Sequence, residues 1–393
     1  GYYFTGRRLL ESILSNTQGI SNSSRAKVLY SAGLIANRQG DCVQALKYYE
    51  ESLTLQREIG DKSGIASSLN GLGNVLHKQG NIEQALKFYE ESLLLWQDIE
   101  DKFGTARCLN NLGNVLHNQG DYKQALKFYE ESLTLRQEIG DKSGIASSLN
   151  NLGVRAYNQG DYQQAQKYHK ESLSINRKLG DKRSIAISLN NLGLGYRRQG
   201  AYEQALKLYK ESLTLHRESG NKSGIANTLY NMGVLAYHKE DYEQAQKLYE
   251  ESLFLARETE DKFSIVRCLK NLANVLHNQG DYKQAQKLYE ESLSLARETE
   301  DKLNIIYCIE GFASIACTKN NPCQAALLLG ATETAIQFLG YKWEEYDLIQ
   351  HKRIITKLHR QMSEEEFIKY WEEGNKLTLE QAVELALKKE NDE

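Results

Sequence analysis

Asparagine side chains recur along this chain at a spacing that could build a recognition surface. One set of positions 40 residues apart holds Asn70, Asn110, Asn150, Asn190, Tyr230 and Lys270. A second set, four residues further on, holds Asn74, Asn114, Val154, Leu194, Val234 and Asn274. A side-chain amide both donates and accepts hydrogen bonds, which suits contact with an extended peptide backbone whatever side chains the peptide carries. The alternative is a plainly solvated helix face whose columns arose by duplication of near-identical repeats.

A third set of positions adds rings and cations to these asparagines. It holds His77, His117, Tyr157, Arg197, Tyr237 and His277, with Arg107 and Arg267 on the preceding turn of their own repeats. Asparagine and histidine thus give way, through an aliphatic and aromatic middle, to Lys and Arg, and a peptide with an apolar anchor and some acidic character would fit. Histidines in neighbouring repeats are too far apart to share a metal that each must approach to about 2 Å, so we expect no metal and no other cofactor.

The chain offers little for catalysis. It has no Ser/His/Asp or Cys/His constellation and no G-x-x-x-x-G-K-[ST] phosphate-binding motif, so we expect neither an enzyme nor ATP binding by that route. Three of its six cysteines, at positions 108, 268 and 308, share one repeat position where other repeats have Ser, and no C-x-x-C pair occurs. We therefore expect small buried cysteines in a reducing compartment.

Composition narrows the class of protein further. The 393 residues include a single Pro, and the net charge is -3 with Lys and Arg alternating with Asp and Glu. Nucleic-acid binding needs a concentrated basic face, and membrane insertion needs an apolar run of roughly 18 residues, so we expect neither. No signal peptide is visible and the first residue is Gly, which indicates a cytoplasmic chain that is processed or a fragment of a longer one.

An internal repeat positions all of these residues. A 40-residue unit begins at Asp61 and recurs from Asp101, Asp141, Asp181, Asn221, Asp261 and Asp301, and a more divergent unit covers about 21–60. Apolar residues fall at helical intervals, as at Ile145, Leu149 and Leu152, and no segment alternates with period two. Each unit is therefore predicted to be two amphipathic helices, and a propeller blade is excluded.

Glycines punctuate each unit in two ways. The break between the two helices reads Q-G-D, where Gly permits a left-handed residue and Asp caps the next helix; Glu240 and Asn320 replace that Gly in two units. A second glycine falls in the middle of the first helix, which predicts a close helix contact, and we expect it to face a column of alanines on the second helix. The two columns are Gly33, Gly73, Gly113, Gly153, Gly193 and Gly233 with Ala273 and Ala313, and Ala45, Ala85, Ala125, Ala165, Ala205, Ala245, Ala285 and Ala325.

The repeat resembles the tetratricopeptide family through L-x-x-L-G-x-x-L/Y, then G-D-Y-x-x-A, then Y and S-L, over about residues 21–340. Its 40-residue period is more similar to the repeats of kinesin light chains and bacterial signalling ATPases than to the usual period near 34; HEAT and armadillo repeats lack this signature. The resemblance implies an all-α, right-handed α-solenoid of about eight helical hairpins. It also implies that the first helix of each hairpin lines the concave side, where the three columns would bind a protein or an extended peptide.

Both ends of the chain resemble a particular class of protein. Leu328, Leu329, Gly330, Ala331 and Glu333, followed by Phe367, Trp371, Gly374, Leu377, Ala382, Ala386 and Leu387, match the C-terminus of bacterial signal-transduction ATPases with numerous domains (STAND) and of LuxR-type regulators. The opening GRRLLESIL is similar to the segment that follows their nucleotide-binding and winged-helix portion. The resemblance implies a ligand-sensing region that contacts an ATPase upstream of residue 1. The alternative is a free-standing scaffold or adaptor.

The expected organisation has three parts. An N-terminal capping helix occupies residues 1–20, and a solenoid with units 21–60, 61–100, 101–140, 141–180, 181–220, 221–260, 261–300 and 301–340 follows. A helical C-terminal cap covers 341–393, where Ser363 with Glu366 and Thr378 with Gln381 match the capping box. No change of composition marks a domain boundary before the last seventy or so residues.

Overall fold

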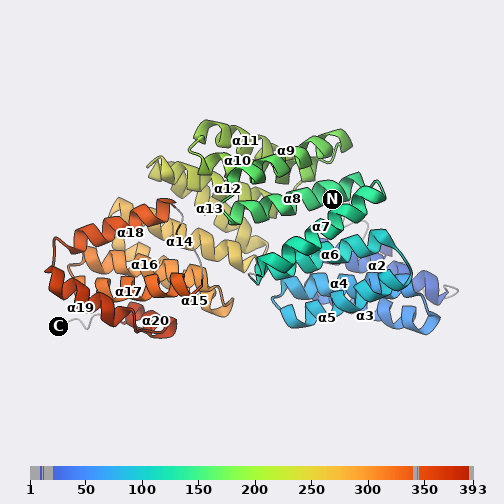
Figure 1. Ribbon diagram of the computed structural model, residues 1–393, viewed down its shortest axis with the longest axis horizontal. Helices are drawn as coiled ribbons and strands as arrows, with labels where there is room; N and C mark the ends of the chain where they lie inside the picture. Colours follow the sequence, from blue (N-terminus) through green and yellow to red (C-terminus); the bar gives the residue numbers. More distant parts are fainter. Residues whose placement is uncertain are drawn as a thin grey trace. The chain divides into compact units, whose positions relative to one another are not determined.

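The computed structural model describes residues 9–10, 12, 21–119, 121–339, 343 and 345–388, and these residues form helices and connecting turns without any strand (Figure 1). The all-α fold expected from the repeat is therefore confirmed. The expected capping helix at 1–20 lies outside the described residues except for positions 9, 10 and 12. None of the described helices combines the length and the apolar character that crossing a membrane requires.

Successive helices pack as hairpins that keep the 40-residue register (Figure 1). We call the two helices of a unit helix A and helix B. The helices are α2 (Asn22–Gln39), α3 (Cys42–Ile59), α4 (Lys62–Lys78), α5 (Ile82–Asp98), α6 (Lys102–Asn118), α7 (Tyr122–Glu138), α8 (Lys142–Asn158), α9 (Tyr162–Leu179), α10 (Lys182–Arg198), α11 (Tyr202–Glu218), α12 (Lys222–His238), α13 (Tyr242–Glu258), α14 (Lys262–Gln279), α15 (Tyr282–Glu298), α16 (Lys302–Thr318), α17 (Pro322–Phe338), α18 (Glu345–Leu358), α19 (Glu364–Gly374) and α20 (Leu379–Leu387).

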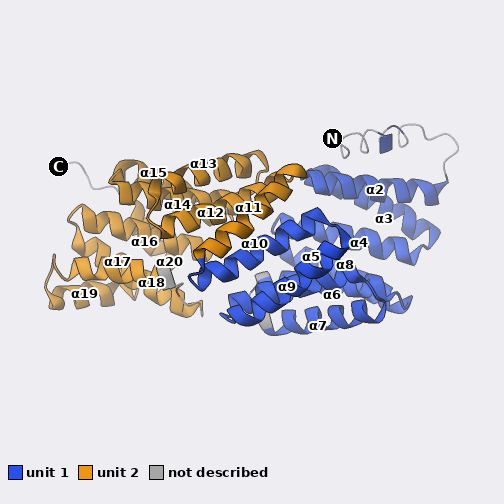
Figure 2. Cartoon of the chain, turned by 90° about the horizontal axis from the view of Figure 1, so that it is seen from above, with its two compact units in different colours: residues 1–201 blue, residues 202–393 orange. Residues whose placement is uncertain are grey.

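The chain divides into two compact units, residues 1–201 and residues 202–393 (Figure 2). The first unit contains α2 to α10 and the second contains α11 to α20. The division falls between helix A and helix B of the 181–220 repeat, where the sequence shows no change of composition. Each unit is described here by itself.

Helix ends carry the caps that the sequence predicts. Asp61 Oδ1 accepts a hydrogen bond from the Gly64 amide at 3.0 Å, and Asp121 Oδ1 accepts one from the Gln124 amide at 3.1 Å. Glu240 and Asn320 take the left-handed conformation expected of them, with φ of 60° and 62°. Three further glutamates between repeats, Glu100, Glu260 and Glu300, do the same. A side chain with a Cβ is strained in this region, so the turns are fixed by the packing of the helices they join.

An aromatic ring of helix B lies closest to the place where the mid-helix glycine lacks a side chain. A Cβ on Gly73 would lie 2.7 Å from the ring of Tyr89, and one on Gly113 would lie 2.7 Å from the ring of Tyr129. The alanines of helix B expected at this crossing are fully buried, as Ala85 and Ala125 are, and the ring one turn further on presses against the glycine. The glycine is needed because a ring lies flat where its side chain would be.

A buried serine hydroxyl ties three helices together in each repeat junction. Ser132 Oγ on α7 donates to the Ala106 carbonyl on α6 at 2.7 Å and lies 3.4 Å from Ser148 Oγ on α8. The cysteines expected to be small and buried occupy this place in three repeats, where Cys108 and Cys268 lie 3.1 and 3.2 Å from Ser92 and Ser252. A thiol thus replaces the second hydroxyl, and all six cysteines are free.

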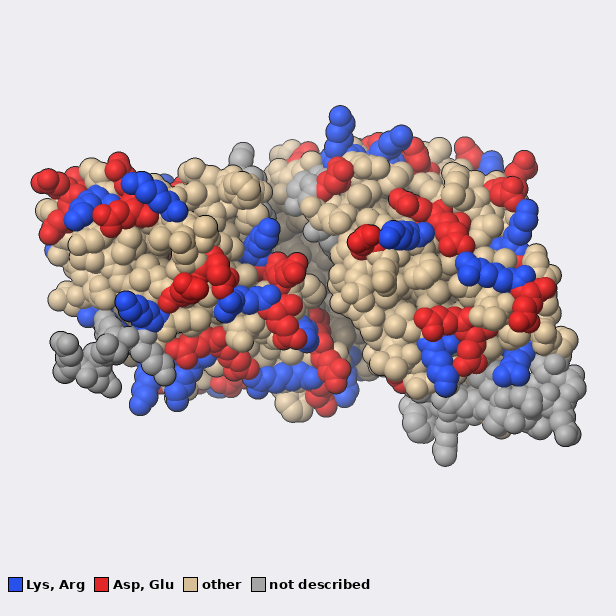
Figure 3. All heavy atoms as spheres, turned by 90° about the horizontal axis from the view of Figure 1, so that it is seen from below, with Lys and Arg blue, Asp and Glu red and all other residues tan. Residues whose placement is uncertain are grey.

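Charged side chains on the outer surface pair within one helix, between the two helices of one repeat, or between neighbouring repeats. Lys62 binds Asp98 at 2.6 Å, and Arg57 binds Glu91 at 2.8 Å. Both signs are interspersed over the two units on the face drawn in Figure 3. These groups are about half exposed, so each pair contributes at most a few tenths of a kcal/mol.

The C-terminal helices cover the end of the second unit. Gly330 on α17 and Gly374 on α19 allow the two backbones to meet, because a Cβ on Gly330 would lie 2.4 Å from the Trp371 carbonyl oxygen. Both predicted capping boxes form, at Ser363 with Glu366 and at Thr378 with Gln381. This cover buries the apolar end of α17, including Leu328 and Leu329.

Substitution of two helix-interior glycines tests the ring contact. Gly113→Ala should lower the free energy of unfolding by about 1–3 kcal/mol, because the new methyl group overlaps the Tyr129 ring. Gly195→Ala is the matched control, since its nearest neighbour is the flexible Gln166 side chain at 3.1 Å, and it should stabilise the helix by up to about 1 kcal/mol. Urea unfolding of both variants measures the difference, and equal effects would contradict the ring contact.

Candidate functional site

The predicted binding residues lie on the A helices, but none of them is fully exposed. Five are buried: Asn70, Asn110, Asn190, Arg197 and Tyr237. The others are half-buried: Asn74, Asn114, Asn150, Asn274, Arg107, Arg267, His77, His117, Tyr157, Tyr230 and Lys270. The expectation that the first column faces solvent is therefore wrong for Asn70, Asn110 and Asn190, which are 2, 7 and 3% exposed.

Asn70 and Asn110 are covered because each one bonds to the next helix A. Asn111 Nδ2 donates to Asn70 Oδ1 at 2.8 Å and also lies 3.2 Å from Asn74 Oδ1. The arrangement recurs one repeat later, where Asn151 Nδ2 lies 2.9 and 3.1 Å from the Oδ1 atoms of Asn110 and Asn114. Asn191 then reaches Asn150 at 3.0 Å. We call this set, residues 70, 74, 110, 111, 114, 150, 151 and 191 of α4 to α10, the asparagine ladder.

The ladder is also joined to the core beneath it. The hydroxyl of Tyr89, whose ring lies against Gly73, donates to Asn74 Oδ1 at 2.8 Å, and Tyr129 donates to Asn114 Oδ1 at 2.9 Å. Oδ1 of Asn74 and of Asn114 therefore receives one hydrogen bond from its own repeat and one from the next. Within the described part of the chain, Nδ2 of these two residues makes no hydrogen bond to protein. Half-buried Asn74 and Asn114 can thus offer N–H donors to a ligand, and not carbonyl acceptors.

Sequence reasoning missed the donors of the ladder. Asn111, Asn151 and Asn191 each follow a predicted binding residue directly, so the doubled Asn-Asn was the available signal. The sequence alone does not reveal the structural role of the doubled Asn, because neighbouring residues on a helix point in different directions. The second Asn of each pair meets the first Asn of the preceding repeat only when the two repeats are packed together.

The third column of the first unit is partly occupied by its own neighbours. Tyr157 OH accepts a hydrogen bond from Arg198 Nε at 2.6 Å, and His117 Nε2 lies 3.1 Å from Asn158 Nδ2. Burial lowers the pKa of His77 below its ordinary value. Arg107 lies over the Trp96 ring at 5.7 Å, so the cation is held by an aromatic face.

The second unit carries cations on the same helical positions. Arg267 lies over the Tyr230 ring at 4.6 Å, and Lys270 lies over the Tyr307 ring at 4.5 Å. Tyrosine hydroxyls take over as acceptors here, since Asn271 Nδ2 donates to Tyr230 at 2.8 Å and Asn278 Nδ2 donates to Tyr237 at 2.8 Å. Asn274 keeps the bond to the core, because its Oδ1 accepts from Tyr289.

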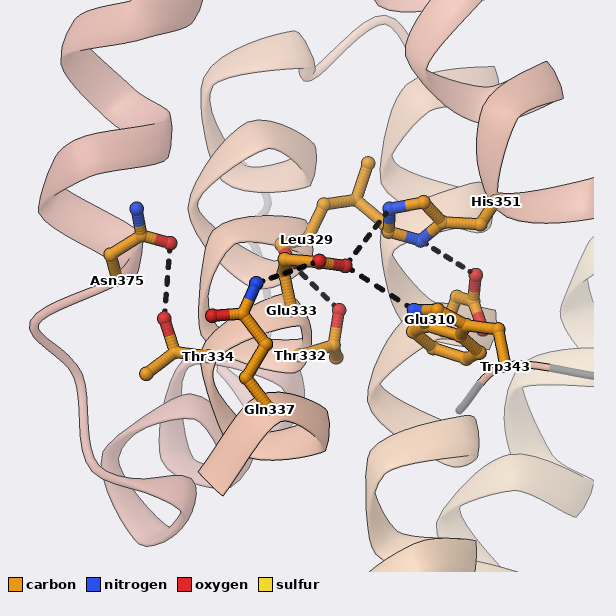
Figure 4. A network of polar contacts seen from close by, with 9 residues as sticks. All are labelled: Glu310, Leu329, Thr332, Glu333, Thr334, Gln337, Trp343, His351 and Asn375. Atoms are coloured by element: carbon orange, nitrogen blue, oxygen red, sulfur yellow. Dashed lines mark hydrogen bonds and ion pairs between the residues drawn. The ribbon is translucent and has the colours of Figure 1, made fainter. Parts of the chain in front are cut away.

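Glu310, on α16, occupies the first-column position one repeat after Lys270. It belongs to a buried polar network that links α16 to the C-terminal cap (Figure 4). His351 Nδ1 lies 3.0 Å from Glu310 Oε1, and this pair has the 41-residue separation of the ladder bonds. His351 Nε2 lies 3.8 Å from Glu333, which also accepts a hydrogen bond from Trp343 Nε1 at 3.2 Å. Burial raises the pKa of Glu310, and His351 partly opposes that rise. Glu333 belongs to the C-terminal motif noted in the sequence. Together with Glu310 it fixes α18 to α16 and α17.

The described residues contain no candidate metal site. No group of three or more His, Cys, Asp or Glu side chains there lies close enough to hold an ion.

One repeat replaces the core tyrosine with a histidine. The ring of His169 lies against Gly153, its Nδ1 is 3.1 Å from Asn150 Oδ1, and it is 2% exposed. Burial lowers its pKa from 6.5 to about 4, so the folded chain holds this ring neutral.

This histidine should make stability depend on pH. The unfolded chain binds the proton near pH 6.5 and the folded chain only near 4, so stability falls as the pH drops through that window. We expect a loss of about 2 kcal/mol between pH 7 and pH 5 from this group, and His169→Tyr should lack it. Urea unfolding of both proteins at the two pH values is the test, and equal losses would contradict the assignment.

Comparison with solved structures places the fold among bacterial and archaeal tetratricopeptide proteins. A Rap protein complexed with competence and sporulation factor has a TM-score of 0.63 at 16% identity, over 75% of this chain and 80% of that chain. The apo form of the quorum sensor NprR from B. thuringiensis has a TM-score of 0.52 at 19% identity, over 84% and 98%. A STAND protein with a tetratricopeptide repeat sensor from Pyrococcus horikoshii has a TM-score of 0.54 at 16% identity, over 94% of this chain and 55% of that one. At these identities the likeness shows the fold alone.

Sequence comparison gives the family directly. No curated protein matches the chain. The model of the tetratricopeptide repeat matches residues 24–93, 64–138, 144–218, 224–298 and 264–337, which together cover most of the sequence. The chain therefore belongs to the tetratricopeptide repeat family.

Proposed function

We propose that the A-helix faces bind an extended peptide or a protein segment. The observation that carries this proposal is the state of Asn74 and Asn114, whose Oδ1 atoms are already bonded while their Nδ2 donors are left to a ligand. An extended peptide offers backbone carbonyls at regular intervals, and such acceptors match a row of fixed N–H donors. Because the ladder holds each donor in place before binding, little side-chain freedom is lost on association.

The A-helix face of the second unit, taken by itself, carries cations that suit an acidic ligand segment. Arg267 and Lys270 are half-buried and lie over tyrosine rings, and neither has an ion-pair partner among the residues described. A partly dehydrated cation without an acid favours an anionic ligand group. A peptide that binds the second unit would therefore carry an acidic side chain.

We further propose that this chain is the ligand-sensing region of a STAND-type signalling ATPase with a role in transcription or defence. Similarity over 94% of this chain to a STAND protein with a tetratricopeptide sensor supports it, as do the matches at both ends of the sequence. In that arrangement the ATPase lies upstream and contacts the repeats. A free-standing scaffold or adaptor is the second candidate, and the reading frame separates them: an upstream G-x-x-x-x-G-K-[ST] motif supports the sensor, and its absence supports the scaffold.

Replacing the donors while keeping the acceptors tests the peptide site. Asn74→Asp with Asn114→Asp retains an oxygen for Tyr89, Tyr129 and the next repeat but removes both N–H groups. Peptides selected from a random library on the wild-type chain should bind this variant at least about 10-fold more weakly by isothermal titration, because two hydrogen bonds of about 1 kcal/mol each are lost.

Asn221→Asp is the control for added charge, since it caps α12 and Asp stands at that position in most other repeats. It should bind the selected peptides as the wild type does. Unchanged affinity in the double variant, with its melting temperature retained, would contradict the role of the ladder. Failure to select any peptide above background would contradict peptide binding altogether.

A further inference from the structure

Helix α18 differs from the repeat helices in the charge of its exposed face. From Leu348 to Arg360 the segment contains no acidic residue. Four cations there are exposed: Lys352, Arg353 and Lys357 on the helix and Arg360 in the turn that follows. On the B helices, by contrast, exposed lysines and arginines alternate with glutamates and pair with them, as Lys87 pairs with Glu83 at 2.9 Å.

Three of these cations form a stripe along one side of the helix. Arg353 and Lys357 lie one helical turn apart on the same side of α18, and Arg360 continues the row from the turn that follows, over about 10 Å in all. Ile349, one turn before Arg353, extends the stripe with an apolar side chain that is 43% exposed. We call Ile349, Arg353, Lys357 and Arg360 the α18 stripe.

No acidic side chain among the described residues neutralises the stripe. None of its three cations makes an ion pair there, whereas the neighbouring His359 does, with Glu364 at 2.9 Å. Burial lowers the pKa of His277, and Lys357 lowers it further. Burial raises the pKa of Cys317 and of Tyr242, and Lys357 and Arg353, respectively, partly oppose these rises.

The opposite side of α18 is firmly anchored. His351, Ile354 and Leu358 are 4, 8 and 0% exposed, and His351 is held by Glu310 (Figure 4). The stripe is therefore displayed on a helix that is fixed before any partner arrives, which reduces the entropy lost on binding.

We propose that the α18 stripe docks an acidic amphipathic helix of a partner protein. Carboxylates spaced i, i+4 and i+7 on such a helix would meet Arg353, Lys357 and Arg360, and an apolar residue one turn further would cover Ile349. Nucleic acid fits less well, because the stripe spans only about 10 Å, whereas nucleic-acid binding needs a more extended basic face. This surface lies outside the asparagine ladder, and the proposal stands whether or not the ladder binds a peptide.

A labelled model helix tests the docking surface. The probe is an Ala-rich 18-residue peptide with Glu at i, i+4 and i+7 and Leu one turn beyond, compared by fluorescence anisotropy with a scrambled peptide and with a 20-nucleotide DNA duplex. The full chain should bind the patterned peptide, with an affinity that falls between 50 and 200 mM NaCl because the contacts are exposed charges.

Two variants with the same change in net charge locate the binding. Arg353→Gln, Lys357→Gln and Arg360→Gln together should weaken binding at least about 10-fold, whereas Lys47→Gln, Lys87→Gln and Lys127→Gln on exposed positions of B helices should leave it unchanged. Ile349→Ser alone should weaken it by a smaller factor. The proposal is overturned by absence of binding, by equal binding of the scrambled peptide, by equal losses in the two triple variants, or by tighter binding of the DNA.

Discussion

The contact between an aromatic ring on helix B and a glycine on helix A is the constraint on which the structure depends. It sets how closely the two helices approach, and a side chain larger than hydrogen at Gly73 or Gly113 would displace the ring of Tyr89 or Tyr129. The ring also carries a hydroxyl to the edge of the core, where it meets an asparagine of the same helix A. Packing within one hairpin thereby fixes a polar group at its surface.

That polar group then links one repeat to the next. Asn114 accepts from Tyr129 beneath it and from Asn151 of the following helix A, so stability and the geometry of the proposed binding face share the same atoms. A peptide would meet donors whose positions are set by the core. The repeat with Val154 in place of this asparagine has His169 as its core ring, and that ring turns to Asn150 instead. Leu194 and Val234 also replace the asparagine, but their repeats keep the tyrosine, at Tyr209 and Tyr249.

Much of the fold followed from the sequence because it is local. The 40-residue period, the helical spacing, the Asp caps and the two capping boxes each depend on residues a few positions apart, and the structure has all of them. The close contact at the mid-helix glycine followed as well, but periodicity, which identifies the buried face, does not tell whether the alanine or the ring of the facing helix lies nearer. The burial of Asn70 and Asn110 was missed for a related reason. A polar residue on a helix surface is predicted to be exposed, and only the packing of the next repeat shows that it is covered. The network of Glu310, Glu333 and His351 joins three helices, so no local pattern in the sequence predicts it.

A double-mutant cycle between Tyr129 and Asn114 tests the central claim most directly, namely that the core ring and the surface asparagine act as one unit. The free energies of unfolding of Tyr129→Phe, Asn114→Ala and the double variant would be measured by urea denaturation against the wild type. We predict a coupling energy of about 0.5–1.5 kcal/mol, because either single change already removes the shared hydrogen bond. Additive effects of the two substitutions would contradict the account.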